Sequence, residues 1–225
     1  MKVLIVCAHP EPRSLNVATM EKAAAILRNL GHEIDTSDLY ESGFADICDQ
    51  SKGVSSTNVK NAIESERIKV ENADALIIQF PLWWLGMPAV LVSWAEMVFA
   101  EPWGFSKTQS FNNGRFSNKR VLLSVTTGGS SKMYEKKGLN GCIEQILFPI
   151  QHGIFNLCGF QVLPPLVGYS VAQFDKARDL YFSNLEGRLN NLFEEKPIKY
   201  NEVEMFKSGV LISEFETDLE KLRKT

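Results

Sequence analysis

Short apolar runs alternate along this chain with longer segments in which apolar residues recur every three or four positions. The apolar runs lie at residues 3–8, 75–80, 120–125 and 160–167, and a more polar segment at 33–39 has the length of a further strand. Uninterrupted apolar runs of this length are typical of strands covered on both faces of a parallel sheet. The pattern therefore predicts five strands, most of them buried.

The segments between these strands have helical periodicity. We expect helices over residues 14–30, 61–70, 89–99, 141–157 and 174–193, and a short one over 214–223. The polar stretch 42–60 is expected to be a loop.

This alternation of strand and helix favours right-handed crossovers within one sheet. The predicted fold class is α/β: a flavodoxin-like, doubly wound, five-stranded parallel sheet of order 2-1-3-4-5 with helices on both faces. Residues 1–195 are expected to form this domain, and residues 196–225 a carboxyl-terminal extension of it, because no linker composition separates them.

The expected helix at residues 89–99 is apolar around most of its circumference, interrupted only by Ser93 and Glu96. A helix that packs one face on a sheet does not require this, and stable monomers seldom expose contiguous apolar patches. We therefore expect a homodimer in which a second copy covers this helix and the active sites are shared, with Trp103 and Phe105 as candidates for reaching across the interface.

Charge and cysteine content exclude several classes of protein. Lys and Arg number 24 and Asp and Glu 27, a net charge of −3 without blocks of like charge, so nucleic acid is not an expected partner. Cys7 and Cys158 lie in apolar surroundings, which favours buried, reduced thiols. No cysteine spacing suits zinc, so no metal is expected. No apolar run is long enough for a membrane span and no signal peptide is evident, so we expect a cytoplasmic protein.

Three segments with suitable chemistry follow predicted strands, where open α/β sheets bind ligands. Residues 80–88 read Phe-Pro-Leu-Trp-Trp-Leu-Gly-Met-Pro, and residues 126–130 read Thr-Thr-Gly-Gly-Ser. The tryptophans could flank a planar ligand or pack the loop, and the glycines could admit a ligand or make a turn. Residues 14–16, at a helix start, could bind an anion or cap the helix. Together the segments favour a flat, polar ring system.

Missing motifs narrow the ligand class further. The chain has neither GxGxxG after the first strand nor GxxxxGK[ST], so the corresponding dinucleotide and triphosphate sites are not expected. The loop after the first strand contains His9, Pro10, Glu11 and Arg13 instead of the hydroxyl-rich phosphate cradle of an electron-carrier flavodoxin.

At these loops the chain resembles the NAD(P)H:quinone oxidoreductase family, which are DT-diaphorase-like flavoproteins with a flavodoxin-like fold. The resemblance covers roughly residues 3–195, with matching segments at 3–9, 37–40, 79–84, 124–130, 133–134, 148–154 and 158–163. It implies a homodimer with FAD in each crevice, FMN being possible, and NADH or NADPH as hydride donor.

The resemblance also implies site residues by position. On the diphosphate and adenosine side of FAD they are His9, Ser14, Leu15 and Asn16, assisted by Arg178. Lining the flavin they are Pro81, Leu82, Trp83, Trp84, Leu85, Thr126, Thr127, Gly128, Gly129 and Tyr134. The implied catalytic positions are Tyr134 and Asn140, and the implied substrate-pocket residues are Trp103, Phe105 and Lys107.

Departures from the animal members of the family affect the acceptor side. Asn140 stands where those enzymes have the histidine partner of the tyrosine matched by Tyr134, and an amide can donate a hydrogen bond but cannot act as a general acid near neutral pH. Phe105 and Lys107 stand at two tyrosine positions of the quinone pocket. The chain looks more like a bacterial-type member, with the flavin site kept and the acceptor open.

The expected function is two-electron reduction of quinones or similar electrophiles by ping-pong hydride transfer through bound FAD. Two alternatives remain: an FMN-dependent azo- or nitroreductase, and a regulatory flavin-binding ancillary subunit of a potassium-efflux system. Gly129→Val is expected to block flavin binding while the fold stays intact, because a side chain would enter the ligand's space.

Overall fold

The computed structural model describes residues 1–48, 53, 55–207 and 210–211. They build a parallel sheet of order β2-β1-β3-β4-β5, in which a further strand, β6, also pairs with β4. The strands are β1 (Lys2–Cys7), β2 (Glu33–Asp38), β3 (Ala75–Pro81), β4 (Arg120–Thr127), β5 (Gln161–Val162) and β6 (Leu166–Tyr169). The predicted fold class and strand order are confirmed, with one difference at the edge.

The strand predicted over residues 160–167 is two strands. β5 pairs with the start of β4, through Arg120 and Gln161, and β6 pairs with its end, through Thr127 and Tyr169. Pro164 and Pro165 lie between the two strands, and proline has no N–H group for a β-ladder. The interruption matters because β6 brings Tyr169 to the carboxyl end of the sheet.

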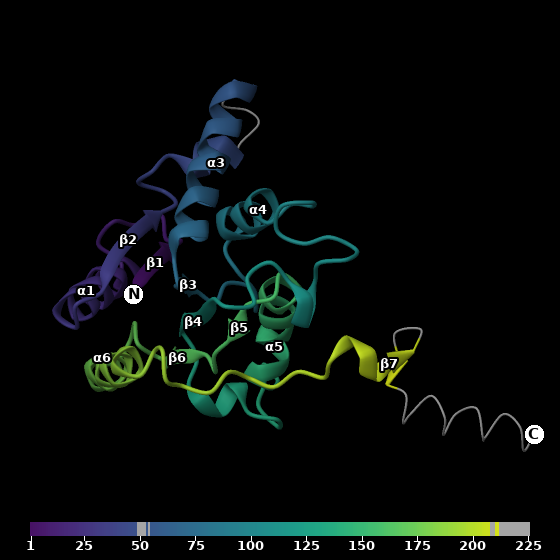
Figure 1. Cartoon of the computed structure of the whole chain (residues 1–225). Helices are drawn as coiled ribbons and strands as arrows, with labels where there is room; N and C mark the ends of the chain where they lie inside the picture. Colours follow the sequence, from purple (N-terminus) through teal and green to yellow (C-terminus); the bar gives the residue numbers. More distant parts are fainter. Residues whose placement is uncertain (49–52, 54, 208–209, 212–225) are drawn as a thin grey trace, which may run out of the picture.

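Helices cover both faces of the sheet (Figure 1). On one face, α1 (Leu15–Asn29) and α6 (Asp175–Asn190) enclose one apolar core. On the other, α4 (Ala89–Val98) and α5 (Ile143–Ile150) enclose a second core. The central strands are buried on both faces, as their continuous apolar runs predict: all seven residues of β3 are buried.

Two helix predictions are corrected. The stretch 42–60 is not all loop, because it contains α2 (Phe44–Cys48) and the start of α3 (Ser56–Asn72). α3 begins before the expected residue 61 because the Ser55 hydroxyl caps it, accepting the Asn58 N–H at 3.3 Å. Its first turns are polar, so the search for apolar periodicity did not detect them. The helix predicted over 141–157 is α5 followed by a π-helical segment, Gln151–Asn156, which adjoins Pro149 within α5.

Most apolar residues of α4 are buried within the chain, including Val90, Leu91, Trp94 and Val98. The helix contacts α2 and α3 as well as the sheet side of its core, and the Trp94 indole N–H donates to the buried Glu66 carboxylate at 2.8 Å. Val92, 45% exposed, is the main exception. The chain's own helices thus cover part of the surface that we expected a second copy to cover, and the side of α4 that carries Val92 stays open.

Beyond α6, the chain crosses to the amino ends of the strands. Arg120 Nη1 donates to the carbonyl oxygens of Leu192 and Glu195, at 3.2 and 2.7 Å. A small antiparallel pair, β7 (Phe206–Lys207) and β8 (Val210–Leu211), follows at one side of the molecule (Figure 1). The helix predicted over 214–223 lies outside the described residues. Among the helices that are described, none has the length and apolar character needed to cross a bilayer.

Candidate functional site

The candidate site lies where β3, β4 and β6 end side by side. The Leu82 N–H donates to the Thr126 carbonyl at 2.8 Å, which joins the loops after β3 and β4. The Ser170 N–H donates to the Gly129 carbonyl at 3.1 Å, which joins β6 to the same place. The predicted segments 81–85 and 126–129 are thus brought together by adjacent, parallel strands.

A two-residue turn places an indole at the lip of this site. Trp83 and Gly86 exchange backbone hydrogen bonds of 3.1 and 2.9 Å, so Trp84 and Leu85 form the tip, with φ angles of 53° and 57°. Such angles are uncommon for residues other than glycine, asparagine and aspartate. The Trp84 side chain is fully exposed, whereas Trp83 packs against His9 with ring centroids 5.5 Å apart. Trp83 is itself 40% exposed, so loop packing accounts for part of Trp83 and for none of Trp84.

The two glycines after β4 have different surroundings. A Cβ on Gly128 would meet nothing closer than Gln173 Nε2 at 3.9 Å, whereas one on Gly129 would lie 3.0 Å from Tyr134 Cε2 and 3.1 Å from Met133 Sδ. Within the described part of the chain, no hydrogen bond uses the backbone N–H of either glycine. The site therefore offers two free, adjacent N–H donors, with open space beside Gly128.

Tyr134 and Tyr169 form a pair of aromatic side chains beside these donors. Their ring centroids lie 5.8 Å apart, and Tyr134 is 7% exposed. Burial, and then the negative charge of Glu144, raises the pKa of Tyr169, which keeps its hydroxyl protonated. Tyr169 was missed by the sequence analysis, although an aromatic residue two positions after the end of a predicted strand was a usable signal.

Asn140 lies at the base of the loop that carries Tyr134. Its backbone N–H donates to the Met133 carbonyl at 2.8 Å. The side-chain amide makes no hydrogen bond with any described residue, so it is free to bind a ligand.

The residues after β1 have structural roles in this chain. The Ser14 hydroxyl accepts the Val17 N–H at 3.2 Å and caps α1, which is the capping alternative. His9 Nδ1 accepts the Glu11 N–H at 3.1 Å. Leu15 packs against the core beneath α1. The helix start still offers backbone N–H groups to an anion, but the Ser14 side chain is already engaged.

Asn16 belongs to a buried polar network beneath the site. Its Oδ1 accepts hydrogen bonds from Gln79 Nε2 at 2.8 Å and from the Thr126 hydroxyl at 3.2 Å. Gln79 Oε1 in turn accepts from the Tyr181 hydroxyl at 3.2 Å, and Tyr181 also bonds Ser124 at 2.8 Å. The network fixes α1, β3, β4 and α6 relative to one another. Sequence reasoning missed Gln79, Ser124 and Tyr181 because their partners lie far away in the chain.

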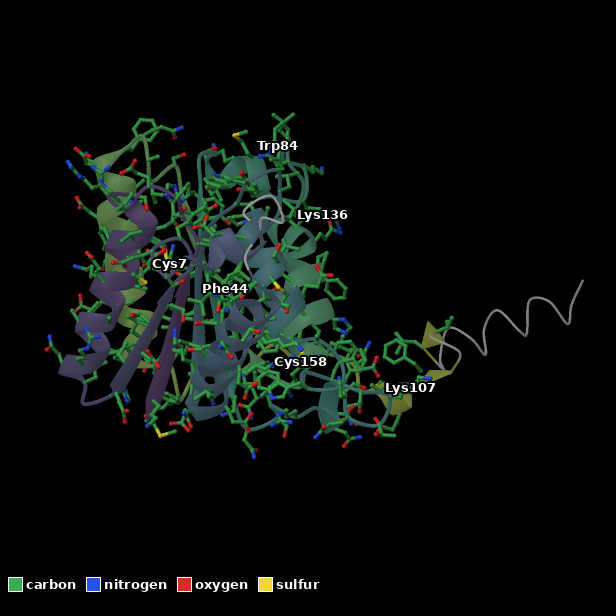
Figure 2. The ribbon with its side chains drawn as sticks, turned by 90° about the horizontal axis from the view of Figure 1, so that it is seen from above. Cys7, Phe44, Trp84, Lys107, Lys136 and Cys158 are labelled. Atoms are coloured by element: carbon green, nitrogen blue, oxygen red, sulfur yellow. The ribbon has the colours of Figure 1, made fainter. Side chains whose placement is uncertain are left out.

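Within one chain, the predicted substrate-pocket residues do not lie at the carboxyl ends of the strands, where the candidate site is. Because α4 runs back along the sheet, Trp103 lies near the amino ends of the strands, packed against Phe116 with centroids 5.3 Å apart. Figure 2 shows Trp84 at one end of the molecule and Lys107 at the other. Phe105 lines an apolar hollow beside α4.

Arg178 lies on α6 and pairs with Asp175 of the same helix. The pairing leaves its side chain 38% exposed. In the part of the chain that the structure describes, no group of His, Cys, Asp and Glu side chains is arranged to hold a metal ion.

Comparisons with known proteins agree with this architecture. The chain matches the family model for the flavodoxin-like fold over residues 1–189. It is 37% identical to NAD(P)H dehydrogenase (quinone) 1 of Rattus norvegicus, in an alignment covering 91% of this chain and 82% of the rat protein. It is 34% identical to the ribosyldihydronicotinamide dehydrogenase (quinone) of the same species, covering 88% and 94%. A solved Klebsiella pneumoniae protein, described as a candidate quinone reductase, has a TM-score of 0.78 and 35% identity, covering 95% and 92%.

Proposed function

This chain belongs to the flavodoxin-like family and, within it, to the NAD(P)H dehydrogenases (quinone), and from that premise we propose that it binds a flavin and reduces quinones with NADH or NADPH. The observation that carries the proposal is the pair of free N–H donors at Gly128 and Gly129, beside open space, with the exposed indole of Trp84 on the adjoining loop. A flat ring with polar atoms along one edge matches this arrangement.

The residues fit a flavin ring in shape and in hydrogen-bonding chemistry. A ring edge that carries carbonyl oxygens and nitrogens needs donors, and the Gly128 and Gly129 N–H groups are directed by a loop that Thr127 fixes, since its hydroxyl donates to the Gly129 carbonyl at 2.9 Å. The open space beside Gly128 allows close approach of a ring. When bound, a flavin supplies the two-electron chemistry between nicotinamide and quinone.

Each of these residues of the candidate site would then have a separate role in binding or catalysis. Gly128 and Gly129 would orient the ring edge and stabilise negative charge that develops there. The Tyr134 hydroxyl, which makes no hydrogen bond within the described residues, would donate to the same edge, assisted by the Asn140 amide. Trp84 would cover the ring face and exclude water from the reacting atoms.

We propose FAD over FMN as the cofactor. The free N–H groups at the start of α1 would hold its diphosphate, with His9 and Leu15 beside it and the capped Ser14 fixing the helix start. Arg178 would assist from α6. Release of the cofactor by heat, followed by mass measurement, distinguishes FAD from FMN.

We also propose that the active unit is a homodimer. An apolar hollow of about 460 Å³ lies between α4 and the π-helical segment, bordered by Val92, Phe105 and Ile154 among others. A second copy seated there would bury Val92 and could bring Trp103, Phe105 and Lys107 to its partner's site, which one chain does not achieve. Sedimentation of flavin-loaded protein should give about twice the 25.3 kDa chain mass. A fully active species of single-chain mass would contradict this proposal.

The reaction is tested by spectroscopy of purified protein. The flavin absorption band should be present, should bleach with NADH or NADPH without oxygen, and should return when a simple naphthoquinone is added. A colourless protein that shows no melting shift with FAD or FMN would contradict flavin binding. Bleaching that an azo dye reverses and a quinone does not would favour the azoreductase alternative. Retrieval of a membrane transporter, without quinone reduction, would favour the ancillary-subunit alternative.

A further inference from the structure

The loop between β4 and α5 carries lysines that no described carboxylate neutralises. Lys132, Lys136 and Lys137 are exposed, and Glu135 between them is exposed as well. None of the three lysines forms an ion pair within the described part of the chain. The loop therefore presents unpaired positive charge to solvent.

Lys136 and Lys137 occupy the middle of a tight turn. The Gly138 N–H donates to the Glu135 carbonyl at 2.8 Å. The loop closes on itself at this glycine, because a Cβ there would lie 2.4 Å from the Lys132 carbonyl oxygen. The backbone carrying the two ammonium groups is thus fixed before any ligand binds, which lowers the entropy cost of binding.

This turn lies at the mouth of the candidate site. The loop begins directly after Gly129 and contains Tyr134, and two residues of chain span at most about 7 Å, so the Cα atom of Lys136 lies within about 7 Å of that of Tyr134. Figure 2 shows Lys136 toward the same end of the molecule as Trp84, and Lys107 at the opposite end. An anionic group on a ligand held between Trp84 and Tyr134 would meet these lysines.

Among the molecules of the proposed reaction, the reduced dinucleotides carry such a group. NADH and NADPH both have a diphosphate, and NADPH adds a 2′-phosphate, whereas ribosyldihydronicotinamide and simple quinones have no phosphate. Relatives named for the two kinds of donor are similar to the chain to nearly the same degree, 37% and 34% identical, so overall similarity does not choose between them.

We propose that Lys136 and Lys137 bind the phosphates of the reduced dinucleotide and so make this chain dinucleotide-dependent, an inference that rests on the proposed function. Positive charge at the mouth raises the encounter rate of an anionic donor and holds it in the ground state and the transition state alike. Binding of this uniform kind lowers KM and leaves kcat nearly unchanged.

The test compares a double variant, Lys136→Ala with Lys137→Ala, with a charge-matched control, Lys196→Ala with Lys199→Ala, whose lysines are exposed in the segment after α6. Holoenzymes are assayed with NADPH, NADH and reduced nicotinamide riboside against one naphthoquinone. Removal of two charged hydrogen-bond donors should lower kcat/KM for the dinucleotides about tenfold or more. The value for the riboside, and all values for the control, should stay within about twofold.

Affinity for NADP⁺, measured by calorimetry on the flavin-loaded protein, gives a readout that does not depend on turnover. It should weaken about tenfold in the double variant and not in the control. A larger loss for NADPH than for NADH would assign the contact to the 2′-phosphate, and equal losses would assign it to the diphosphate. Unchanged dinucleotide kinetics and NADP⁺ affinity, or an equal loss with the riboside, would overturn the proposal. Wild-type protein that binds NADP⁺ through these lysines but reduces no quinone would instead contradict only the proposed function.

Discussion

The two adjacent glycines of the candidate site should respond to substitution in opposite ways. Gly128 faces open space, while a Cβ on Gly129 would lie 3.0 Å from Tyr134 Cε2 and 3.1 Å from Met133 Sδ. Neither glycine has a positive φ angle, so alanine is compatible with the backbone at both. The sequence alone points to Gly129 as the position where a side chain would meet the ligand. Because Gly128 is the open position, we expect a side chain there to meet the ligand.

The magnitudes follow from these contacts. Gly128→Ala should stabilise the flavin-free protein by about 0.4–1 kcal/mol, because alanine restricts the unfolded chain and meets nothing in the fold. Gly129→Ala gains the same term but crowds Tyr134 and Met133, and overpacking costs about 1–3 kcal/mol. The two terms together give a net loss of up to about 2.6 kcal/mol, which lowers Tm by up to roughly 10 °C for a chain of this size.

Flavin affinity should separate the two variants further. A methyl group at Gly128 would occupy the space that a ring needs, so the dissociation constant should rise about tenfold or more, equivalent to about 1.4 kcal/mol. The assay is calorimetric melting of flavin-free protein, combined with flavin titration followed by fluorescence. A Gly128→Ala protein that binds flavin as tightly as the unaltered protein would refute the placement of the ring beside Gly128.

Three further predictions concern catalysis, thiol reactivity and pH. Asn140→Ala should lower quinone reduction less than tenfold, because an amide cannot relay a proton; a loss of ~10²-fold or more, the contribution typical of a proton donor, would contradict this. Burial raises the pKa of the Cys7 and Cys158 thiols to about 12 each, so a thiol reagent at mildly alkaline pH should label Cys142 before either of them. Labelling of Cys7 as early as Cys142, seen by mass spectrometry, would count against the fold. Burial lowers the pKa of His152, which stacks on Phe148 with ring centroids 4.8 Å apart. The folded state thus favours the neutral ring. The free energy of unfolding, measured with urea, should therefore fall as pH drops below the unfolded pKa of about 6.5. His152→Gln should make this fall shallower, and an unchanged slope would show that other groups dominate.

The sequence by itself determined the layered fold. Uninterrupted apolar runs such as residues 75–80 are buried on both sides only if helices cover both faces of the sheet. The alternation of strand and helix then dictates a parallel sheet. Because ligands of such sheets bind at the strand ends, the segments 81–85 and 126–129 could be assigned to one site before any coordinates were known. The sequence also showed which residue types these segments bring to the site, namely two tryptophans and two glycines.

Only the tertiary structure decided which member of each pair is open to a ligand. Trp83 packs on His9 while Trp84 is exposed, and Gly128 is open while Gly129 is crowded, because these differences depend on contacts between loops from different strands. The same holds for the network from Asn16 to Tyr181, whose partners lie far apart in sequence. A one-dimensional pattern reports which face of an element is apolar; it does not report which distant side chain fills the space beside it.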